Sequence, residues 1–443
     1  MELEVALTSL VTHAQPRVVL SLPCAADVDP LRLLEIGKGR ARCFWQTPEG
    51  EGFAGIGAAH RARIVRGDRF RAAKRWAAQW LKPLHLLGAD DAPEPLMMGG
   101  FAFDTRSDER WHVFGSAHFL LPRVMLRWTA EGKWLSVVAS DAAEAQRIWH
   151  RVHQALRRKK RELAPTSCHD SSPIAQPERA IWLAQAQYAI EAVRRGALRK
   201  VVLARAVHYP HCTPDPVNAL ARLRQRYAGS HCFLFEPQPG YAFFGATPEV
   251  LAEVRGRALR TMALAGSAPR GRTPEEDAAR AQALLDSAKD RHEHALVVEA
   301  IVATLRPLSQ AVHAADSPDV LRLPNILHLH TPINAELRPE VNVWDVVAHL
   351  HPTPAVGGLP RSAALALMQR LEPFARGWYA APIGVANAAG EGRFAVAIRS
   401  ALATPHGVTL FAGAGIVADS DPEREWEETA LKLRPLLEAI TGT

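Results

Sequence analysis

The sequence predicts an α+β fold built on antiparallel sheets, with helices packed on their outer faces. Two strand-like runs near the end, Arg393 to Leu402 and Val408 to Ala412, are separated by Pro405-His406-Gly407, which predicts a hairpin. Strands joined by turns this short pair antiparallel, because a parallel pair needs a long crossover. A chain of 443 residues with 48% hydrophobic side chains can bury a large core, in one large domain or in two.

The first part of the chain alternates strand-like runs with helix-like ones, up to about residue 163. The expected strands, followed by the two expected helices, are Arg17 to Leu22, Gly52 to Ala58, His118 to Trp128 and Trp134 to Ala139, then Phe70 to Leu87 and Ala142 to Leu163. Proline and serine are frequent from Ala164 to Pro177, so this stretch predicts a loop between two halves.

The second part is denser in regular elements. The expected elements are a helix from Trp182 to Arg195, a strand from Lys200 to Val207, strands at Phe233, Tyr241 to Gly245 and Ala258 to Ala263, and a long helix from Pro274 to Leu305. The short spacing of these strands again favours antiparallel sheets over a doubly wound parallel one.

Composition argues against several classes of protein. The formal charge of +7 is spread along the chain without interleaved aromatic residues, so we expect no nucleic-acid partner. No apolar run is long enough to span a membrane and the N-terminus lacks a signal-peptide pattern, which favours a cytoplasmic protein. The cysteines are odd in number and lack a Cys-x-x-Cys pair, so we expect neither a disulfide framework nor a zinc site; they are Cys24, Cys43, Cys168, Cys212 and Cys232.

The most informative segment runs from Gly413-Ala414-Gly415 into an acidic helix. Ser420 is the expected N-cap and Glu423 completes a capping box, so Glu423 is expected to be structural. A stripe of charge on a helix is ordinarily a solvated surface, but surface helices seldom need two glycines at their entry. The segment therefore favours a site for an anion and a divalent metal. Three charged groups share one face of this helix: Glu425, Glu428 and Lys432.

A second acidic cluster lies within Lys289-Asp290-Arg291-His292-Glu293-His294. Zinc is improbable, because adjacent helical residues point in different directions and no His-Glu-x-x-His spacing exists. Magnesium prefers oxygen ligands and often takes only one or two protein carboxylates. Glu293 together with Glu428 meets that need, so we expect a Mg²⁺ site between the two helices.

Three isolated residues are candidates for chemistry or binding. Lys200 opens an apolar strand; such a lysine is usually solvated, but in a buried cleft its amine becomes available as a general base. Glu249 follows a turn, and burial would raise the pKa of its carboxyl and let it donate a proton. Arg399 is a charged residue in an apolar strand, and a substrate carboxylate would satisfy its guanidinium.

These segments, in this order, resemble the chorismate-utilising enzymes, which include isochorismate synthases, salicylate synthases and the large subunits of anthranilate and aminodeoxychorismate synthases. The similarity covers about Gln187 to Leu437. The matching motifs are Lys200-Val201-Val202-Leu203-Ala204-Arg205, Gly245-Ala246-Thr247-Pro248-Glu249, Leu264-Ala265-Gly266-Ser267, Lys289-Asp290-Arg291-His292-Glu293-His294, His351-Pro352-Thr353-Pro354-Ala355-Val356-Gly357-Gly358 and Arg376-Gly377-Trp378-Tyr379.

The resemblance implies a single large domain in which two antiparallel sheets pack together between outer helices. It implies an N-terminal part at residues 1–163, woven into the same fold, and a chorismate-binding catalytic region at residues 178–440. Glu293 and Glu428 would be magnesium ligands, with Glu425 acting through water. Lys200 would activate water and Glu249 would protonate the leaving hydroxyl. The implied substrate-binding residues are Ala265, Gly266, Ser267, His328, Ala355, Tyr379, Arg399, Gly413, Gly415 and Lys432.

Within this family the residues favour an isochorismate synthase, which isomerises chorismate to isochorismate. Ala355 aligns with a threonine of the anthranilate-type enzymes, and salicylate synthases resemble that threonine form, whereas alanine matches the isochorismate synthases. Ammonia-using subunits also generally lack a lysine at the position of Lys200. A salicylate synthase is the nearest alternative, ahead of an anthranilate or aminodeoxychorismate synthase subunit. We expect a monomer without a glutaminase partner, serving menaquinone or siderophore synthesis. Departures from the family pattern, which bear on affinity, are Ser267, Ala381 and Arg393.

Overall fold

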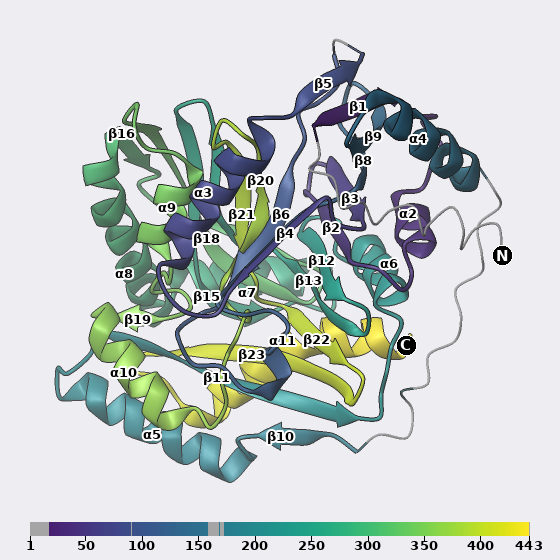
Figure 1. Ribbon diagram of the computed structural model, residues 1–443. Coiled ribbons are helices and arrows are strands. Elements are labelled where there is room, and N and C mark those ends of the chain that lie inside the picture. The colour runs from purple at the N-terminus through teal and green to yellow at the C-terminus, as the bar shows by residue number, and fades with distance from the viewer. Residues whose placement is uncertain (1–16, 90, 158–167, 169–171, 443) are drawn as a thin grey trace.

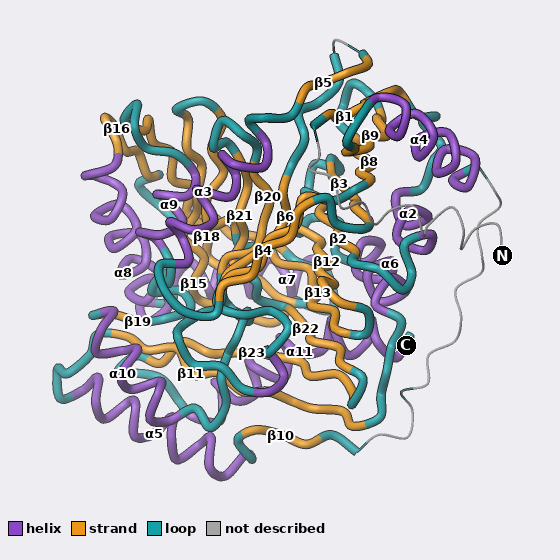
Figure 2. The backbone as a smooth tube through the Cα atoms, in the orientation of Figure 1, coloured by secondary structure: helices purple, strands orange, loops and turns teal. Residues whose placement is uncertain are grey.

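A computed structural model describes residues 17–89, 91–157, 168 and 172–442. Strands of the described chain form a thirteen-stranded sheet and a ten-stranded sheet. The pairing of β1 with β5 is parallel and the other described pairings are antiparallel, which confirms the predicted fold class. Figure 2 shows the strands in the middle of the molecule and helices along its outer sides.

The larger sheet contains strands from both parts of the chain. In spatial order they are β10 (Ile174–Gln176), β11 (Lys200–Pro210), β23 (Gly407–Ile416), β22 (Ser400–Thr404), β13 (Tyr241–Thr247), β12 (His231–Gln238), β2 (Arg42–Gln46), β3 (Gly52–Ile56), β8 (Val124–Trp128), β9 (Lys133–Ala139), β1 (Val18–Pro23) and β5 (His85–Gly88), with β19 (Gly358–Leu359) beside β11.

The smaller sheet also joins the two parts. Its order is β16 (Ser309–Ala314), β18 (Ile326–Leu337), β15 (Ala258–Pro269), β14 (Val250–Arg255), β21 (Gly392–Val396), β20 (Pro382–Ala386), β6 (Met97–Phe101), β7 (Ala117–Leu121) and β4 (His60–Ile64), with β17 (Asp319–Arg322) beside β18. The helices are α2 (Pro30–Ile36), α3 (Arg69–Leu81), α4 (Ala142–Leu156), α5 (Arg179–Arg194), α6 (Pro216–Arg226), α7 (Pro274–Asp286), α8 (Ala288–Leu305), α9 (Val343–Leu350), α10 (Arg361–Leu371) and α11 (Pro422–Thr441).

Alternation along the strands divides the apolar side chains between two cores. On β13, Phe243 belongs to the main core, which side chains from both sheets share, whereas its neighbour Phe244 belongs to a second core. Successive strand residues point to opposite faces, so one strand can serve both. The second core includes Leu220 of α6 and Leu436 of α11, so these helices cover the other face of the larger sheet.

Three expected elements are wrong in extent because a residue interrupts each of them. The helix expected over Phe70 to Leu87 stops at Leu81, two residues before Pro83, and β5 follows. The strand expected over His118 to Trp128 is split at Pro122, where the chain leaves β7 for β8 in the other sheet. The helix expected over Pro274 to Leu305 is two helices, because Ser287 leaves the helical conformation and its side chain accepts a hydrogen bond from the Asp290 amide.

The strand expected over Arg393 to Leu402 is also wrong, and this difference matters for the site. The chain leaves β21 at Val396 and enters β22 at Ser400, so it passes from the smaller sheet to the larger one. Between them Arg399 has φ of 50°, in the left-handed region that non-glycine residues seldom occupy. Helix α4 is described to Leu156; the remainder of its expected span, and most of the expected loop from Ala164, lie outside the described residues.

The sequence analysis expected no disulfide framework, but two of the cysteines form a disulfide. Cys168 and Cys212 form a disulfide with their Cα atoms 4.7 Å apart, although 44 positions separate them in sequence. Cys212 lies just after β11, so the bond ties the segment between the two halves to the end of that strand. Sequence spacing alone did not indicate this pair, because the contact is made by the tertiary fold.

Candidate active site

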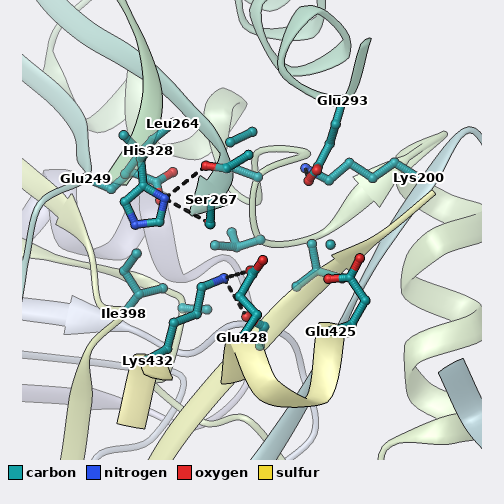
Figure 3. A pocket seen from close by; sticks show the side chains of 18 of the residues that line it. Lys200, Glu249, Leu264, Ser267, Glu293, His328, Ile398, Glu425, Glu428 and Lys432 are labelled. Atoms are coloured by element: carbon teal, nitrogen blue, oxygen red, sulfur yellow. Dashed lines mark hydrogen bonds and ion pairs between the residues drawn. The ribbon is translucent and has the colours of Figure 1, made fainter. Parts of the chain in front are cut away.

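One cavity gathers every residue that the sequence analysis selected. Its lining includes residues of α8, α11, the start of β11 and the end of β23, elements that are labelled in Figure 1, and Figure 3 shows side chains that point into it. The predicted residues that line it are Lys200, Glu249, Ala265, Gly266, Ser267, Glu293, His328, Ala355, Tyr379, Arg399, Gly413, Gly415, Glu425, Glu428 and Lys432. Segments more than two hundred residues apart in the chain thus share one site.

The cavity also contains residues that sequence reasoning did not select, among them Lys289, Asp290, Arg376, Ala380 and Ile398. For the first two a signal existed: they precede Glu293 by four and three positions, so all three share one face of α8. Ala380 and Ile398 are neighbours of Tyr379 and Arg399. Ala380 has φ of 59°, like Arg399 in the left-handed region, and its amide donates to the Ala397 carbonyl.

The two glycines of the C-terminal segment are explained by close approach. A β-carbon at Gly415 would lie 2.3 Å from Oε1 of Glu293 and 3.1 Å from Cε of Lys200. A β-carbon at Gly413 would lie 3.1 Å from the Tyr379 hydroxyl. A side chain at Gly415 would displace the Glu293 carboxylate and one at Gly413 would crowd the Tyr379 hydroxyl, so glycine at these positions brings the backbone of β23 close to the cavity.

Strand pairing turns the polar groups of Gly413 and Gly415 away from β11. These residues lie opposite Ala204 and Val202. The Ala204 amide donates instead to Glu372, and the Val202 amide to the Gly357 carbonyl, so neither pair exchanges backbone hydrogen bonds. The pairing of β22 with β23 ends at Phe411, so beyond that point the outer edge of β23 faces the cavity. There the Gly413 carbonyl accepts from Lys432 Nζ at 2.9 Å.

Each of the three predicted metal carboxylates is paired with a lysine, and Figure 3 shows two of these pairs, Lys200 with Glu293 and Lys432 with Glu428. Lys200 Nζ lies 2.8 Å from Glu293 Oε1, and Lys289 Nζ lies 2.9 Å from Glu425 Oε1. Lys432 forms an ion pair with Glu428, one helical turn away on α11. These pairs join α8 to β11 and α8 to α11, so they hold the walls of the cavity together as well as neutralising charge.

Charges in the cluster shift the carboxyl groups in opposite directions. Burial alone would raise the pKa of Glu293, but the charge and hydrogen bond of Lys200, with Lys289 and Lys432, outweigh burial and lower it. The pKa of Glu425 is raised by burial and then by the negative charge of Glu428, which Lys289 only partly offsets. The carboxylates of the cluster therefore repel one another, and the nearby lysines offset this repulsion only in part.

The donor set suits a hard divalent cation, since it consists of carboxylate oxygens from two helices. In the described part of the chain no group of three His, Cys, Asp or Glu side chains is arranged to hold a metal ion. The lysine pairs account for this arrangement, because each occupies an oxygen that a metal would need. The kind of donor fits magnesium, and the magnesium site itself stays a prediction.

Ser420 does not cap α11 as expected. The N-cap is Asp421, whose side chain accepts from the Arg424 amide at 3.0 Å. Ser420 instead accepts from the Val417 amide and donates to Glu425 Oε1 at 2.8 Å, so it fixes a carboxylate of the cluster. The expected capping box is therefore also wrong: Glu423 does not close one with Ser420, and its side chain pairs with Arg179 on the surface instead.

Lys200 and Glu249 enter the cavity from different sides (Figure 3). The Lys200 side chain is 1% exposed and the residue Glu249 is 3% exposed, so neither is a solvated surface group. Burial raises the pKa of Glu249 to about 7, even though positive charges on Lys200, Arg399 and Lys432 lower it. Near neutral pH a large fraction of this carboxyl therefore carries a proton that it can donate.

A hydrogen-bonded chain fixes Arg399 and Ser267 through His328. Nδ1 of His328 lies 3.1 Å from the Gly266 carbonyl and 3.0 Å from Ser267 Oγ, so this nitrogen carries the hydrogen. Nε2 then accepts from Arg399 Nη2 at 3.0 Å. Burial, with the charges of Arg399 and Lys432, lowers the pKa of His328 well below its usual range, so the ring is neutral. The serine hydroxyl hydrogen stays available to the cavity.

Arg376 supports the wall that carries Ala355. Its guanidinium is fully buried, pairs with Glu372, and donates to the carbonyls of Val356 and Val202 at 2.8 Å each. These bonds tie the loop around Ala355 to β11, next to Lys200. Tyr379 stacks on Phe411 at 5.3 Å between ring centroids, and burial raises the pKa of its hydroxyl to about 12, so the hydroxyl remains a donor.

Two packed antiparallel sheets with one buried site of carboxylates, lysines and an arginine define an enzyme for a small anionic substrate. The chain belongs to the family of chorismate binding enzymes, whose sequence model matches residues 6–441. The resemblance found in the sequence is thereby confirmed. Within the described residues, no helix combines the length and the apolar character that crossing a membrane requires.

Relatives match nearly the whole chain. A salicylate biosynthesis isochorismate synthase of Pseudomonas aeruginosa is 39% identical over 440 residues, covering 94% of this chain and 89% of the relative. Isochorismate synthase MenF of Bacillus subtilis is 33% identical, covering 94% and 92%. Among solved structures, MenF, the menaquinone-specific isochorismate synthase of Escherichia coli, superposes with a TM-score of 0.81 at 28% identity, covering 99% of this chain and 98% of that one.

Proposed function

We propose that this protein is an isochorismate synthase, which converts chorismate to isochorismate with magnesium. The observation that carries the proposal is the placement of a buried lysine and a buried, readily protonated carboxyl on different sides of one cavity. An isomerisation that adds water at one ring carbon and expels a hydroxyl from another needs a base and an acid in such an arrangement. The relatives that cover nearly the whole chain support the same reaction.

The proton transfers follow from these two residues. Lys200, as a neutral amine, takes a proton from the water whose oxygen bonds to ring carbon 2. The ring double bond shifts, the bond from carbon 4 to its hydroxyl breaks, and Glu249 gives that hydroxyl its proton. One water is consumed and one is released. Lys200 ends protonated and Glu249 ends ionised, and exchange with solvent restores both.

The substrate's enolpyruvyl carboxylate is assigned to Arg399, Tyr379 and the backbone of Gly413 and Gly415. Arg399 supplies a buried guanidinium that pairs with no described carboxylate, and Tyr379 supplies a hydroxyl donor beside it. Arg399 lies on the segment that leads from β21 of the smaller sheet to β22 of the larger one, with its backbone in the left-handed region. His328, Ser267 and Lys432 would border the ring, and Ala355 would face it from the loop that Arg376 holds.

Magnesium would be held by Glu293 and Glu428, with Glu425 acting through water. Bound there, it would neutralise and orient the ring carboxylate of the substrate. Nζ of Lys200 is paired with Glu293 in this structure, and a cation held by Glu293 would free that amine to act as the base. The proposal also includes a monomer without a glutaminase subunit, working in the cytoplasm as expected from the sequence.

Product identification tests the proposal. The enzyme is incubated with chorismate and MgCl₂, with and without ammonia, and the products are separated and identified. We expect isochorismate in both reactions. Salicylate as the main product would assign the chain to the salicylate synthases, and anthranilate formed only with ammonia would assign it to the amine-forming enzymes.

The pH dependence of kcat provides a second test. Glu249 must be protonated to act as the acid, and burial raises its pKa to about 7. In enzyme whose Lys200 amine is already neutral, as the mechanism requires, the active fraction therefore falls as pH rises through that value. We expect kcat to decline about tenfold per pH unit above roughly pH 8. Circular dichroism across the same range separates this loss from unfolding. A kcat that stays level from about pH 6 to about pH 9 would contradict the role of Glu249 as the acid.

A further inference from the structure

The three lysine–glutamate pairs of the cavity are not equivalent in their access to solvent. The side chain of Lys200 is 1% exposed and that of Lys432 is 13% exposed, whereas that of Lys289 is 33% exposed. Lys432 is further held by the Gly413 carbonyl. Lys289 therefore lies at the rim of the cavity. Its ammonium group can leave the carboxylate of Glu425 and become hydrated without passing through the buried interior.

Lys289 lies where the two acidic helices meet. It occupies the first turn of α8, and its partner Glu425 occupies the first turn of α11. Glu425 is 4% exposed, and its Oε1 accepts both Lys289 at 2.9 Å and Ser420 at 2.8 Å. Glu428, three positions further along α11, and Glu293 of α8 line the same cavity as Glu425, so three carboxylates face one another with little water to screen their charges.

We propose that Lys289 is the resident counter-cation of the acidic cluster, which stabilises the metal-free enzyme and which a divalent cation displaces into solvent. The inference rests on the proposed magnesium site and adds a role for a residue outside the reaction itself. An ammonium group and a divalent cation both relieve the repulsion between Glu425, Glu428 and Glu293, so they compete for these carboxylates. Lys289 thereby lowers the affinity of the site for magnesium and prevents the empty cluster from destabilising the fold.

The competition predicts opposite changes in two properties that are measured without turnover. Replacing Lys289 by methionine keeps the length and apolar stem of the side chain but removes its charge. The metal-free variant is expected to unfold several degrees below the wild type, because a buried carboxylate loses its partner. The Kd of the variant for Mg²⁺ is expected to fall by roughly fivefold or more, because the metal no longer displaces an ammonium group.

The experiment compares four full-length proteins by calorimetric titration with MgCl₂ alone and by thermal unfolding with and without MgCl₂. They are the wild type, Lys289→Met, Lys289→Arg and Lys74→Met. Arginine keeps the positive charge and is expected to restore values near those of the wild type. Lys74 pairs with Asp345 at 2.7 Å, away from the cavity, and controls for the loss of an ordinary ion pair.

The outcomes separate this inference from the proposed function. A Kd for Mg²⁺ in Lys289→Met that equals or exceeds that of the wild type overturns the inference while leaving the magnesium site in place. Wild-type protein that neither binds MgCl₂ nor gains thermal stability from it removes the magnesium site, and the inference falls with it. If Lys289→Met does not fold without metal but folds in MgCl₂, the role of Lys289 as the counter-cation is supported.

Discussion

Replacing Lys200 by alanine is expected to lower kcat by about 10³-fold, because the variant lacks the amine that takes the proton from water. The residue lies at the start of β11, is almost fully buried, and has Glu293 within 2.8 Å. Its loss removes both the proposed base and the internal partner of Glu293, a proposed metal ligand. The loss should appear in kcat, measured by following isochorismate formation at saturating chorismate and MgCl₂.

The same variant separates catalysis from folding. Glu293 loses its partner, so the metal-free variant is expected to unfold earlier, and MgCl₂ should recover most of that stability. Lys74→Ala, outside the cavity, serves as the matched control and should turn over at close to the wild-type rate. Turnover of Lys200→Ala within a few fold of the wild type, with the fold intact, would remove Lys200 from the mechanism.

Replacing Glu249 by glutamine is expected to lower kcat by about 10²- to 10⁴-fold, since the amide has nearly the same shape but cannot give its proton to the leaving hydroxyl. Because Glu249 has no described ion-pair partner, and its carboxyl is largely protonated near neutral pH, the neutral amide should be accommodated without destabilising the fold. Steady-state kinetics and thermal unfolding of the variant test both statements.

Glu423→Gln is the matched control for this substitution. Glu423 belongs to the acidic segment but lies on the surface, paired with Arg179, so its replacement should leave kcat near the wild-type value. The assignment of Glu249 would be wrong if Glu249→Gln kept most of its turnover, or if both glutamine variants lost activity to the same extent.

The residues selected from the sequence for the site line one cavity, whereas the path of the backbone between them was predicted less well. Lys200, Glu249 and Arg399 carried a physical signal of their own, but others, such as His328 and Ala355, were selected only through the family resemblance. The break at Arg399 was not predicted, since an apolar run does not reveal that its two halves belong to different sheets. That break decides where the guanidinium points.

Sequence patterns did not predict the contacts between side chains of distant segments. Ser420 satisfies the local pattern of a helix cap, yet in the structure Asp421 is the cap and Ser420 binds Glu425 instead. Lys289 precedes Glu293 by one helical turn, and its partner Glu425 lies on another helix 136 positions later. Such contacts depend on how α8 and α11 are brought together, which only the tertiary structure specifies.

The most direct test of the proposed reaction is to convert chorismate in water enriched in the heavy oxygen isotope and to measure the mass of the product and of its fragments by mass spectrometry. Because Lys200 is proposed to activate solvent water for attack at ring carbon 2, the isochorismate should carry one heavy oxygen, at carbon 2. Isochorismate without heavy oxygen would show that the hydroxyl migrates within the substrate, and would contradict the roles of Lys200 and Glu249. A different product would contradict the assignment of the enzyme itself.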